Sequence, residues 1–231
     1  MTENKITPRF DSQDVVYQSA DLSTDDCLDQ TLSDYFNPQA QMSPIQIEAV
    51  SAAIMSRRPG CNMLVFGLGN DSPLWANLNK SGYTLFIENA PGWVSKIVGQ
   101  FPYLNVEVVD YPTTVSQSMR DPIKTMAAME IPAFLTERKW DVILVDGPMG
   151  YREDLPGRAL PIYWASKVCK DSTHIFVDDY ERDVEKFYAD FLFMARKPNR
   201  SVVLPRPAKP RLNASEMLWL FGVSDALNTA S

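Results

Sequence analysis

The chain has 231 residues, 45% of them hydrophobic and 22% charged, and its formal net charge is −7. This length and composition are typical of one large globular domain. The acidic balance argues against nucleic acid as a partner, because phosphate binding draws on clustered Lys and Arg. No stretch reaches the roughly 18 apolar residues of a membrane span.

The first predicted element is a helix that begins near residue 43. Ser43, Pro44 and Gln46 form a helix-start pattern, since Ser caps the first turn, Pro fits its first position and Gln reaches back to the chain. Before it the sequence is polar and weakly patterned. We therefore expect residues 1–42 to be an N-terminal arm that is partly mobile, and residues 43–231 to form one folded domain.

Strands and helices then alternate along the chain. Short apolar runs closed by Gly or an acidic residue indicate buried strands, and segments with helical spacing lie between them. The predicted strands are 62–66, 83–87, 106–109, 140–145 and 174–177, and the predicted helices are 72–78, 91–100, 160–170 and 181–192. The Pro-interrupted stretch between the third and fourth strands carries no clear pattern.

The C-terminal part differs from the rest. Two predicted strands, 201–204 and 217–223, are joined by a Pro- and Arg-rich loop without a helix, which is typical of an antiparallel hairpin. The whole order predicts an α/β fold with a Rossmann-like, seven-stranded sheet of the methyltransferase type, mostly parallel and closed by this hairpin.

The first strand ends in a glycine loop that predicts a nucleoside cofactor. Gly67 and Gly69 let the backbone turn sharply and approach a ligand. A dinucleotide site places a third glycine where this chain has Ser72, so the loop fits a ligand without a pyrophosphate. Glu88, at the tip of the second strand, is placed to bind ribose hydroxyls. These features favour S-adenosylmethionine, and the other predicted contacts are Asn70, Asp110, Tyr111 and Asp146.

Three aspartates form the predicted catalytic group. Asp146 follows the fourth strand, and Asp178 and Asp179 follow the fifth. Neighbouring parallel strands lie about 5 Å apart, so these acids are expected to converge. A hydroxyl that accepts a methyl group must lose its proton to a base or be activated by a divalent cation. Both readings stay open: the acids act as a base, or Asp146 and Asp179 hold a divalent cation.

Cationic residues beside Asp146 predict an acidic substrate, because Arg grips a carboxylate with two hydrogen bonds. Tyr151, Arg152 and Arg158 are candidate contacts for a uronic acid, with solvated loop side chains as the alternative. His174 is the only histidine. We expect it to start the fifth strand, far from the site, and to be structural.

Several motifs together resemble the glucuronoxylan 4-O-methyltransferase family, which carries a plant-type polysaccharide-biosynthesis domain. They are Leu64-Val-Phe-Gly-Leu-Gly-Asn-Asp71, Trp140-Asp-Val-Ile-Leu-Val-Asp-Gly-Pro-Met-Gly-Tyr151, Pro156-Gly-Arg158, Thr173-His-Ile-Phe-Val-Asp-Asp179 and Leu218-Trp219. The resemblance implies transfer of a methyl group from S-adenosylmethionine to the 4-hydroxyl of glucuronic acid on a glycan. It also implies cofactor contacts at Gly67, Gly69 and Glu88, and catalysis around Asp146 and Asp179.

The chain departs from this family at two positions beside the site. Met149 stands where the family often has a lysine, and Asp178 where it has a histidine. Losing a cation and gaining an anion alters proton handling or favours a metal. Plant members carry a Golgi anchor, which this polar N-terminus lacks. We therefore expect a cytoplasmic protein as the chain is written, or a Golgi-lumenal one if an anchor was removed.

Two other functions fit the same sequence. One is an O-methyltransferase that acts on a different hydroxyl, on a small phenol or another uronic acid. The other is a non-catalytic polysaccharide-assembly protein on the same fold. The glycine loop, Glu88 and the three aspartates favour an enzyme.

Overall fold

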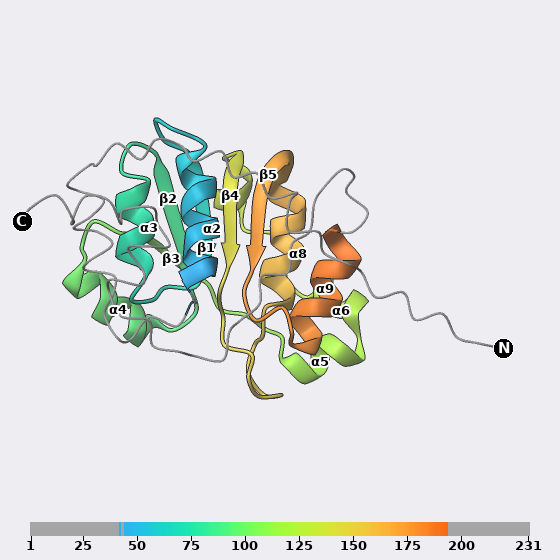
Figure 1. Ribbon diagram of the computed structural model, residues 1–231. Helices are drawn as coiled ribbons and strands as arrows, with labels where there is room; N and C mark the ends of the chain where they lie inside the picture. The colour runs from blue at the N-terminus through green and yellow to red at the C-terminus, as the bar shows by residue number, and fades with distance from the viewer. Residues whose placement is uncertain (1–41, 43, 194–231) are drawn as a thin grey trace, which may run out of the picture.

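The computed structural model describes residue 42 and residues 44–193 (Figure 1). Within this part, five strands form one sheet in the order β3-β2-β1-β4-β5, and all neighbouring strands are parallel. The strand order reverses between β1 and β4. In doubly wound sheets, ligands bind outside the carboxyl ends of the strands at such a switch point.

The strands are short and mostly apolar, as strands covered on both faces must be. In the middle of the sheet, β1 and β4 have nearly all side chains buried, whereas β3 at the edge is mostly exposed. The bounds are β1 Asn62–Phe66, β2 Tyr83–Glu88, β3 Asn105–Val108, β4 Trp140–Val145 and β5 Cys169–Val177.

Three helices cover one face of the sheet: α2 (Pro44–Met55), α3 (Ser72–Leu78) and α4 (Pro91–Gln100). A proline in the first turn starts α3 and α4, where a missing N–H leaves no helical bond unmade. Apolar side chains of these helices pack with alternate residues of β1 and β4 in one buried cluster, which includes Trp75 and Ile97.

The opposite face is covered by α8 (Ala159–Val168) and α9 (Asp183–Phe193). These helices share a second buried cluster with the other side chains of β1, β2 and β4, built around Trp140 and Trp164. Because both faces are covered, the only part of the central strands left for chemistry is their ends.

Three short helices fill the stretch between β3 and β4 that carries no sequence pattern: α5 (Val115–Arg120), α6 (Pro122–Met126) and α7 (Ala133–Thr136). Thr114 and Gln117 form a capping box at the start of α5. Helices this short depend on caps and tertiary packing for their stability. They are too short to show a helical repeat of apolar residues, so the sequence pattern does not predict them.

The described elements confirm the predicted order and correct some ends. The predicted helix 160–170 ends at Val168, because the backbone turns extended at Cys169, which pairs with Trp140. As a result β5 starts at Cys169, and His174 lies within the strand rather than at its start. Strand β3 lies one residue earlier than predicted.

Five parallel strands agree with the predicted α/β class, but the predicted seven strands are not tested. The hairpin of residues 201–204 and 217–223 lies outside the described residues, as does nearly all of the N-terminal arm. Met42, its last residue, packs into the first buried cluster. In the part of the chain that the structure describes, no helix is long and apolar enough to cross a bilayer.

Candidate functional site at the carboxyl edge of the sheet

The loops after β1 and β4 meet backbone to backbone at the switch point. Gly67 has a φ of +116°, which an L side chain rarely adopts. A Cβ on Gly147 would lie 2.8 Å from the Gly67 Cα, closer than real Cβ contacts allow. Asp146 N–H donates to the Phe66 carbonyl at 2.8 Å, so the two loops are also hydrogen-bonded. These glycines bring Asp146 against the glycine loop.

On its other side, the glycine loop is fixed by hydrogen bonds to Glu88. One Glu88 carboxylate oxygen accepts from the Leu68 N–H at 3.1 Å, and the other accepts from Asn89 and Ala90 at 2.7 and 3.0 Å. The indole N–H of Trp93 donates to the Leu68 carbonyl at 2.5 Å. A carboxylate offers about four acceptor positions, so Glu88 keeps room for one more hydrogen bond.

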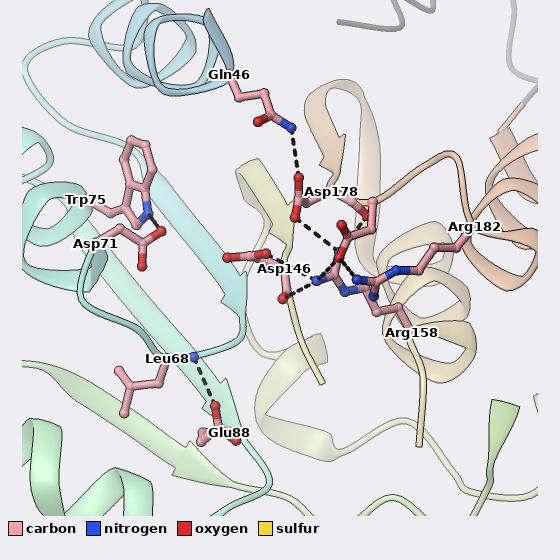
Figure 2. A network of polar contacts seen from close by, with 10 residues as sticks. Gln46, Leu68, Asp71, Trp75, Glu88, Asp146, Arg158, Asp178 and Arg182 are labelled. Carbon is pink, nitrogen blue, oxygen red and sulfur yellow. Dashed lines mark hydrogen bonds and ion pairs between the residues drawn. The ribbon is translucent and has the colours of Figure 1, made fainter. Parts of the chain in front are cut away.

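Asp146 lies at the centre of a group of acids that converge from three strand ends (Figure 2). Asp71 lies on its β1 side and accepts from the Trp75 indole at 3.0 Å. Asp178 lies on its β5 side and accepts from the Gln46 amide at 2.8 Å. The predicted convergence of Asp146 and Asp178 is therefore seen in the structure.

A buried cation, Arg158, joins the acids after β4 and β5. Its guanidinium lies 2.9 Å from Asp179, 3.3 Å from Asp146 and 3.5 Å from Asp178. It also donates to the backbone carbonyls of Asp146 and Asp178. Only 4% of Arg158 is exposed. The guanidinium thus holds the loops in place while it neutralises their acids.

The acids are not neutralised equally. Asp179 pairs with Arg182 at 2.8 Å as well as with Arg158, and its φ is +55°. Asp146 pairs with one arginine, Arg158, at 3.3 Å, and 27% of its side chain is exposed. Burial raises the pKa of Asp146 well above its usual range, and the negative charges of Asp71 and Asp178 raise it further, against the lowering effect of Arg158.

Asp71 shares this environment. Burial raises the pKa of its carboxyl, which the hydrogen bond from Trp75 opposes. Nearby Asp178 raises it as well. A carboxyl with a raised pKa holds a proton more strongly, which suits a group that must take a proton near neutral pH. Asp146 has this property and is also accessible.

The loop after Asp146 carries the other predicted substrate contacts to the surface. Tyr151 is 62% exposed, and Arg152 pairs with Asp154 at 2.9 Å at an exposed position. The loop is docked on the start of α5, where Val115 N–H donates to Leu155 at 2.8 Å and the next amide donates to Glu153. Tyr151 is thus presented at the surface by a fixed backbone.

The predicted cofactor contacts fall in different places. Gly67 and Gly69 form the glycine loop, Glu88 is hydrogen-bonded to it, and Asp146 lies beside it. Asn70 and Asp110 are exposed. Tyr111 points into the core, where its ring lies 5.6 Å from Trp164 and only 7% of it is exposed. A cofactor contact at position 111 would therefore involve the backbone.

The sequence predicts no role in the site for Gln46 and Asp71. Gln46 has a second role beyond its place in the helix-start pattern, because its amide reaches from α2 to Asp178. Asp71 belongs to the glycine-loop motif, but nothing in the sequence places it beside Asp146. Its position directly after that loop is the one signal available.

The divalent-cation alternative finds no support. Among the residues that the structure describes, no three His, Cys, Asp or Glu side chains form a group able to hold a metal. The acids predicted as metal ligands, Asp146 and Asp179, instead face the Arg158 guanidinium. A cation between them would compete with that buried positive charge.

A parallel sheet with this strand order, a glycine turn at the switch point and acids after neighbouring strands define a Rossmann-like α/β protein with its site at the strand ends. A family model described as IRX15/IRX15L/GXM matches residues 46–127 and 118–201. The chain belongs to this IRX15/IRX15L/GXM family.

Three relatives from Arabidopsis thaliana illustrate the range of the family. The chain is 36% identical to glucuronoxylan 4-O-methyltransferase 3, over 74% of this chain and 64% of that protein. It is 32% identical to arabinogalactan O-methyltransferase 1, over 84% of this chain and 70% of that protein. It is 31% identical to Protein IRX15-LIKE, over 67% and 57%.

The chain spans just under two thirds of the length of the glucuronoxylan 4-O-methyltransferases that it matches. No solved structure matches it.

Proposed function

We propose that the protein transfers a methyl group from S-adenosylmethionine to the 4-hydroxyl of glucuronic acid on a glycan. The observation that carries this proposal is Asp146, a partly exposed acid with a raised pKa that lies directly against the glycine loop. Relatives named glucuronoxylan 4-O-methyltransferases support the reaction and the acceptor.

The donor is proposed to lie over the loop that Gly67 and Gly69 form. S-adenosylmethionine supplies an electrophilic methyl group on a sulfonium when it is bound. Glu88 has one acceptor position left for a ribose hydroxyl, and the loop itself is already fixed by Leu68 contacts. A loop fixed in advance loses little freedom on binding, which favours affinity.

Asp146 is proposed to be the general base. Its carboxylate accepts the proton of the acceptor hydroxyl while the oxygen forms its bond to the methyl carbon and the bond between that carbon and sulfur breaks. The electron pair of the broken bond leaves with the sulfur. Asp71, Asp178 and Arg158 set the proton affinity of Asp146 through their charges.

For the acceptor, the loop after β4 offers an aromatic and a cationic side chain at the surface. Tyr151 can cover the apolar face of a sugar ring, and Arg152 can pair with its carboxylate. Arg158 is assigned a different role from the sequence prediction. Because it is buried and already faces three carboxylates, we propose that it positions Asp146 rather than the substrate.

The test is an acceptor screen with a methyl-labelled donor. Glucuronoxylan oligosaccharides, glucuronate-bearing arabinogalactan fragments and catechol are incubated with the protein, and products are located by mass spectrometry and NMR. Label on the 4-hydroxyl of glucuronic acid supports the proposal. Label on catechol alone contradicts the acceptor, and no affinity for the donor by calorimetry contradicts the reaction.

Two other functions have a specific observation in their favour. Relatives named arabinogalactan O-methyltransferases are aligned over a larger share of this chain, 83 to 84%, than the glucuronoxylan enzymes are. The same screen separates the two glycans. IRX15-type relatives are 29 to 31% identical. They keep open a non-catalytic role in polysaccharide assembly, which intact donor binding without turnover on any acceptor would favour.

A further inference from the structure

Gln46, in the first turn of α2, is a polar side chain of the site that the proposed mechanism does not use. Figure 2 shows it reaching from its helix toward the acid after β5, where its amide donates to Asp178 Oδ1 at 2.8 Å. Other residues hold the helix on the sheet. Ile47, Val50 and Ile54 are each no more than 2% exposed and pack into the first buried cluster. The hydrogen bond to Asp178 is therefore not what seats α2.

Asp178 is fixed at both of its carboxylate oxygens. Oδ1 accepts from Gln46, and Oδ2 lies 3.5 Å from Arg158 Nη1, which is the longer of these two contacts. The backbone is fixed as well, since the Asp178 N–H donates to the Val145 carbonyl at 3.0 Å. Only 5% of the residue is exposed. An anion buried this deeply depends on such partners to stay ionised.

Asp178 and Asp146 contact the same guanidinium. Arg158 Nη2 lies 3.3 Å from Asp146 Oδ1, and Nη1 lies 3.5 Å from Asp178 Oδ2. Two carboxylates this close repel each other, so a negative charge on one makes the other hold its proton more strongly. The raised pKa of Asp146 agrees with this, since burial is its largest cause and the charge of Asp178 raises it further. The other charged groups around Arg158 and these two acids are Asp71, Asp179, Arg182 and Glu185.

We infer that Gln46 is a positioning residue for the proposed methyl transfer, and that it acts on the proposed base Asp146 by holding the carboxylate of Asp178 ionised beside Arg158. The inference rests on the proposed function. A hydrogen bond to a carboxylate favours its ionised form. The charge that Gln46 maintains on Asp178 then adds to that of Asp71, and Asp146 keeps the proton affinity that a base needs near neutral pH.

The first test is the pH dependence of kcat/KM for Gln46→Met, which keeps the length of the side chain and removes its N–H donors. Without the hydrogen bond, Asp178 takes up a proton at a higher pH. A neutral Asp178 no longer raises the proton affinity of Asp146, so we expect the acid-side fall in activity at a pH lower by about 0.5 to 1 unit. Gln100→Met, the same change at the exposed end of α4, should leave the pH of the fall unchanged.

A double variant tests the route through Asp178. Asp178→Asn removes the charge outright, so the fall should move to lower pH at least as far as in Gln46→Met. Adding Gln46→Met to Asp178→Asn should then move it no further, and a further move overturns the proposed route. A uniform loss of activity with an unchanged pH profile overturns the inference, because a merely structural role predicts it. A fall at higher pH overturns it as well.

The second test does not depend on activity. Carbon-13 NMR follows the side-chain carboxyl carbons of labelled aspartate through a pH titration. The signals of Asp146 and Asp178 are assigned by their loss in Asp146→Asn and Asp178→Asn. In Gln46→Met, we expect the midpoint of Asp178 to rise by about 0.5 to 1 pH unit and that of Asp146 to fall. Gln46→Leu, a second replacement without a donor, should shift both midpoints in the same directions.

Unchanged midpoints overturn the inference even if the protein is an active methyltransferase. Shifted midpoints in a protein that methylates no acceptor uphold the coupling and sink only the proposed function. The two failures are therefore distinguishable.

Discussion

Asp146 differs from its neighbours in how its charge is compensated. Asp179 has two arginine partners within 3 Å, at 2.9 and 2.8 Å. Asp178 is buried, and it contacts the Gln46 amide and the Arg158 guanidinium. Asp146 has one longer ion pair and an exposed edge. Of the three predicted catalytic acids, it is therefore the one with both access to a substrate and a reason to hold a proton.

Asp146→Asn tests this assignment. The amide keeps the size of the side chain but cannot accept a proton, so we expect kcat to fall by about 10²- to 10⁴-fold, the usual contribution of a general base. The Kd for S-adenosylmethionine, measured by calorimetry, should change only a few-fold. Glu137→Gln, at an exposed position before β4, is the control and should stay near the activity of the unchanged protein. Full activity of Asp146→Asn would remove it from the mechanism.

The pH dependence tests the charge of Asp71. Negative charge on Asp71 raises the pKa of Asp146, so Asp71→Asn should lower that pKa and move the acid-side fall in kcat/KM to lower pH. The asparagine oxygen can still accept from the Trp75 indole, so the local fold is kept. The shift is read from initial rates between pH 4 and 8 with saturating donor. A shift to higher pH would contradict this arrangement of charges.

At the scale of elements, the meeting of the β1 and β4 loops sets the geometry of the site. Gly67 carries the positive φ, and Gly147 leaves no room for a Cβ. Strands β1 and β4 are paired in register up to Phe66 and Val145. The next residues therefore turn at the same level, and this brings the donor loop and the proposed base together.

Gly67→Ala should damage this junction. The residue would need a φ of +116°, and its Cβ would lie 3.0 Å from the Gly147 nitrogen. We expect a loss of about 1 to 3 kcal/mol in the free energy of unfolding, together with weaker donor binding. Gly99→Ala, in α4 with no atom near the added Cβ, should instead be neutral or slightly stabilising. Differential scanning calorimetry compares the two, and equal effects would contradict the close packing.

The sequence predicts regular elements well where one physical rule dominates. The apolar runs of β1 and β4 have the predicted bounds, because buried central strands allow few other residues. Prolines mark the starts of α3 and α4. The three short helices before β4 are missed. Thr114 and Asp121 start α5 and α6 by capping rather than by periodicity, and α7 has only four residues.

The site is predicted in part, for a similar reason. Strand ends bring Asp146 and Asp178 together, so simple topology finds them. Sequence does not show where a long side chain turns. Arg158 is read as a substrate contact because it is cationic and near Asp146, yet it folds inward among carboxylates. Tyr111 likewise packs on Trp164, and Gln46 reaches across from another layer.

For the whole molecule, the acidic net charge and a uronate substrate need to be reconciled. A net charge of −7 repels an anionic glycan at long range. Buried Arg158 and partly exposed Arg182 do little to offset this, since both already face acids. Capture of the glycan must then depend on short-range contacts, such as those of the exposed loop after β4.

Higher salt is expected to lower KM for a glucuronate-bearing oligosaccharide, because it screens the repulsion between the protein and the glycan. Kinetics from 20 to 300 mM NaCl check this.

Ligand-dependent stability tests the donor assignment at the same scale. A ligand that binds only the folded state stabilises it by about 2.7 kcal/mol at a hundred times its Kd. For a chain of this length that corresponds to a rise in Tm of about 5 to 10 °C. We expect this rise with S-adenosylmethionine or its demethylated product, and none with NADH, because Ser72 stands where a dinucleotide site places its third glycine. Glu88→Ala should lose most of the rise, since Glu88 both fixes Leu68 and keeps an acceptor position for the ribose. A rise with NADH alone would instead assign the glycine loop to a nicotinamide cofactor.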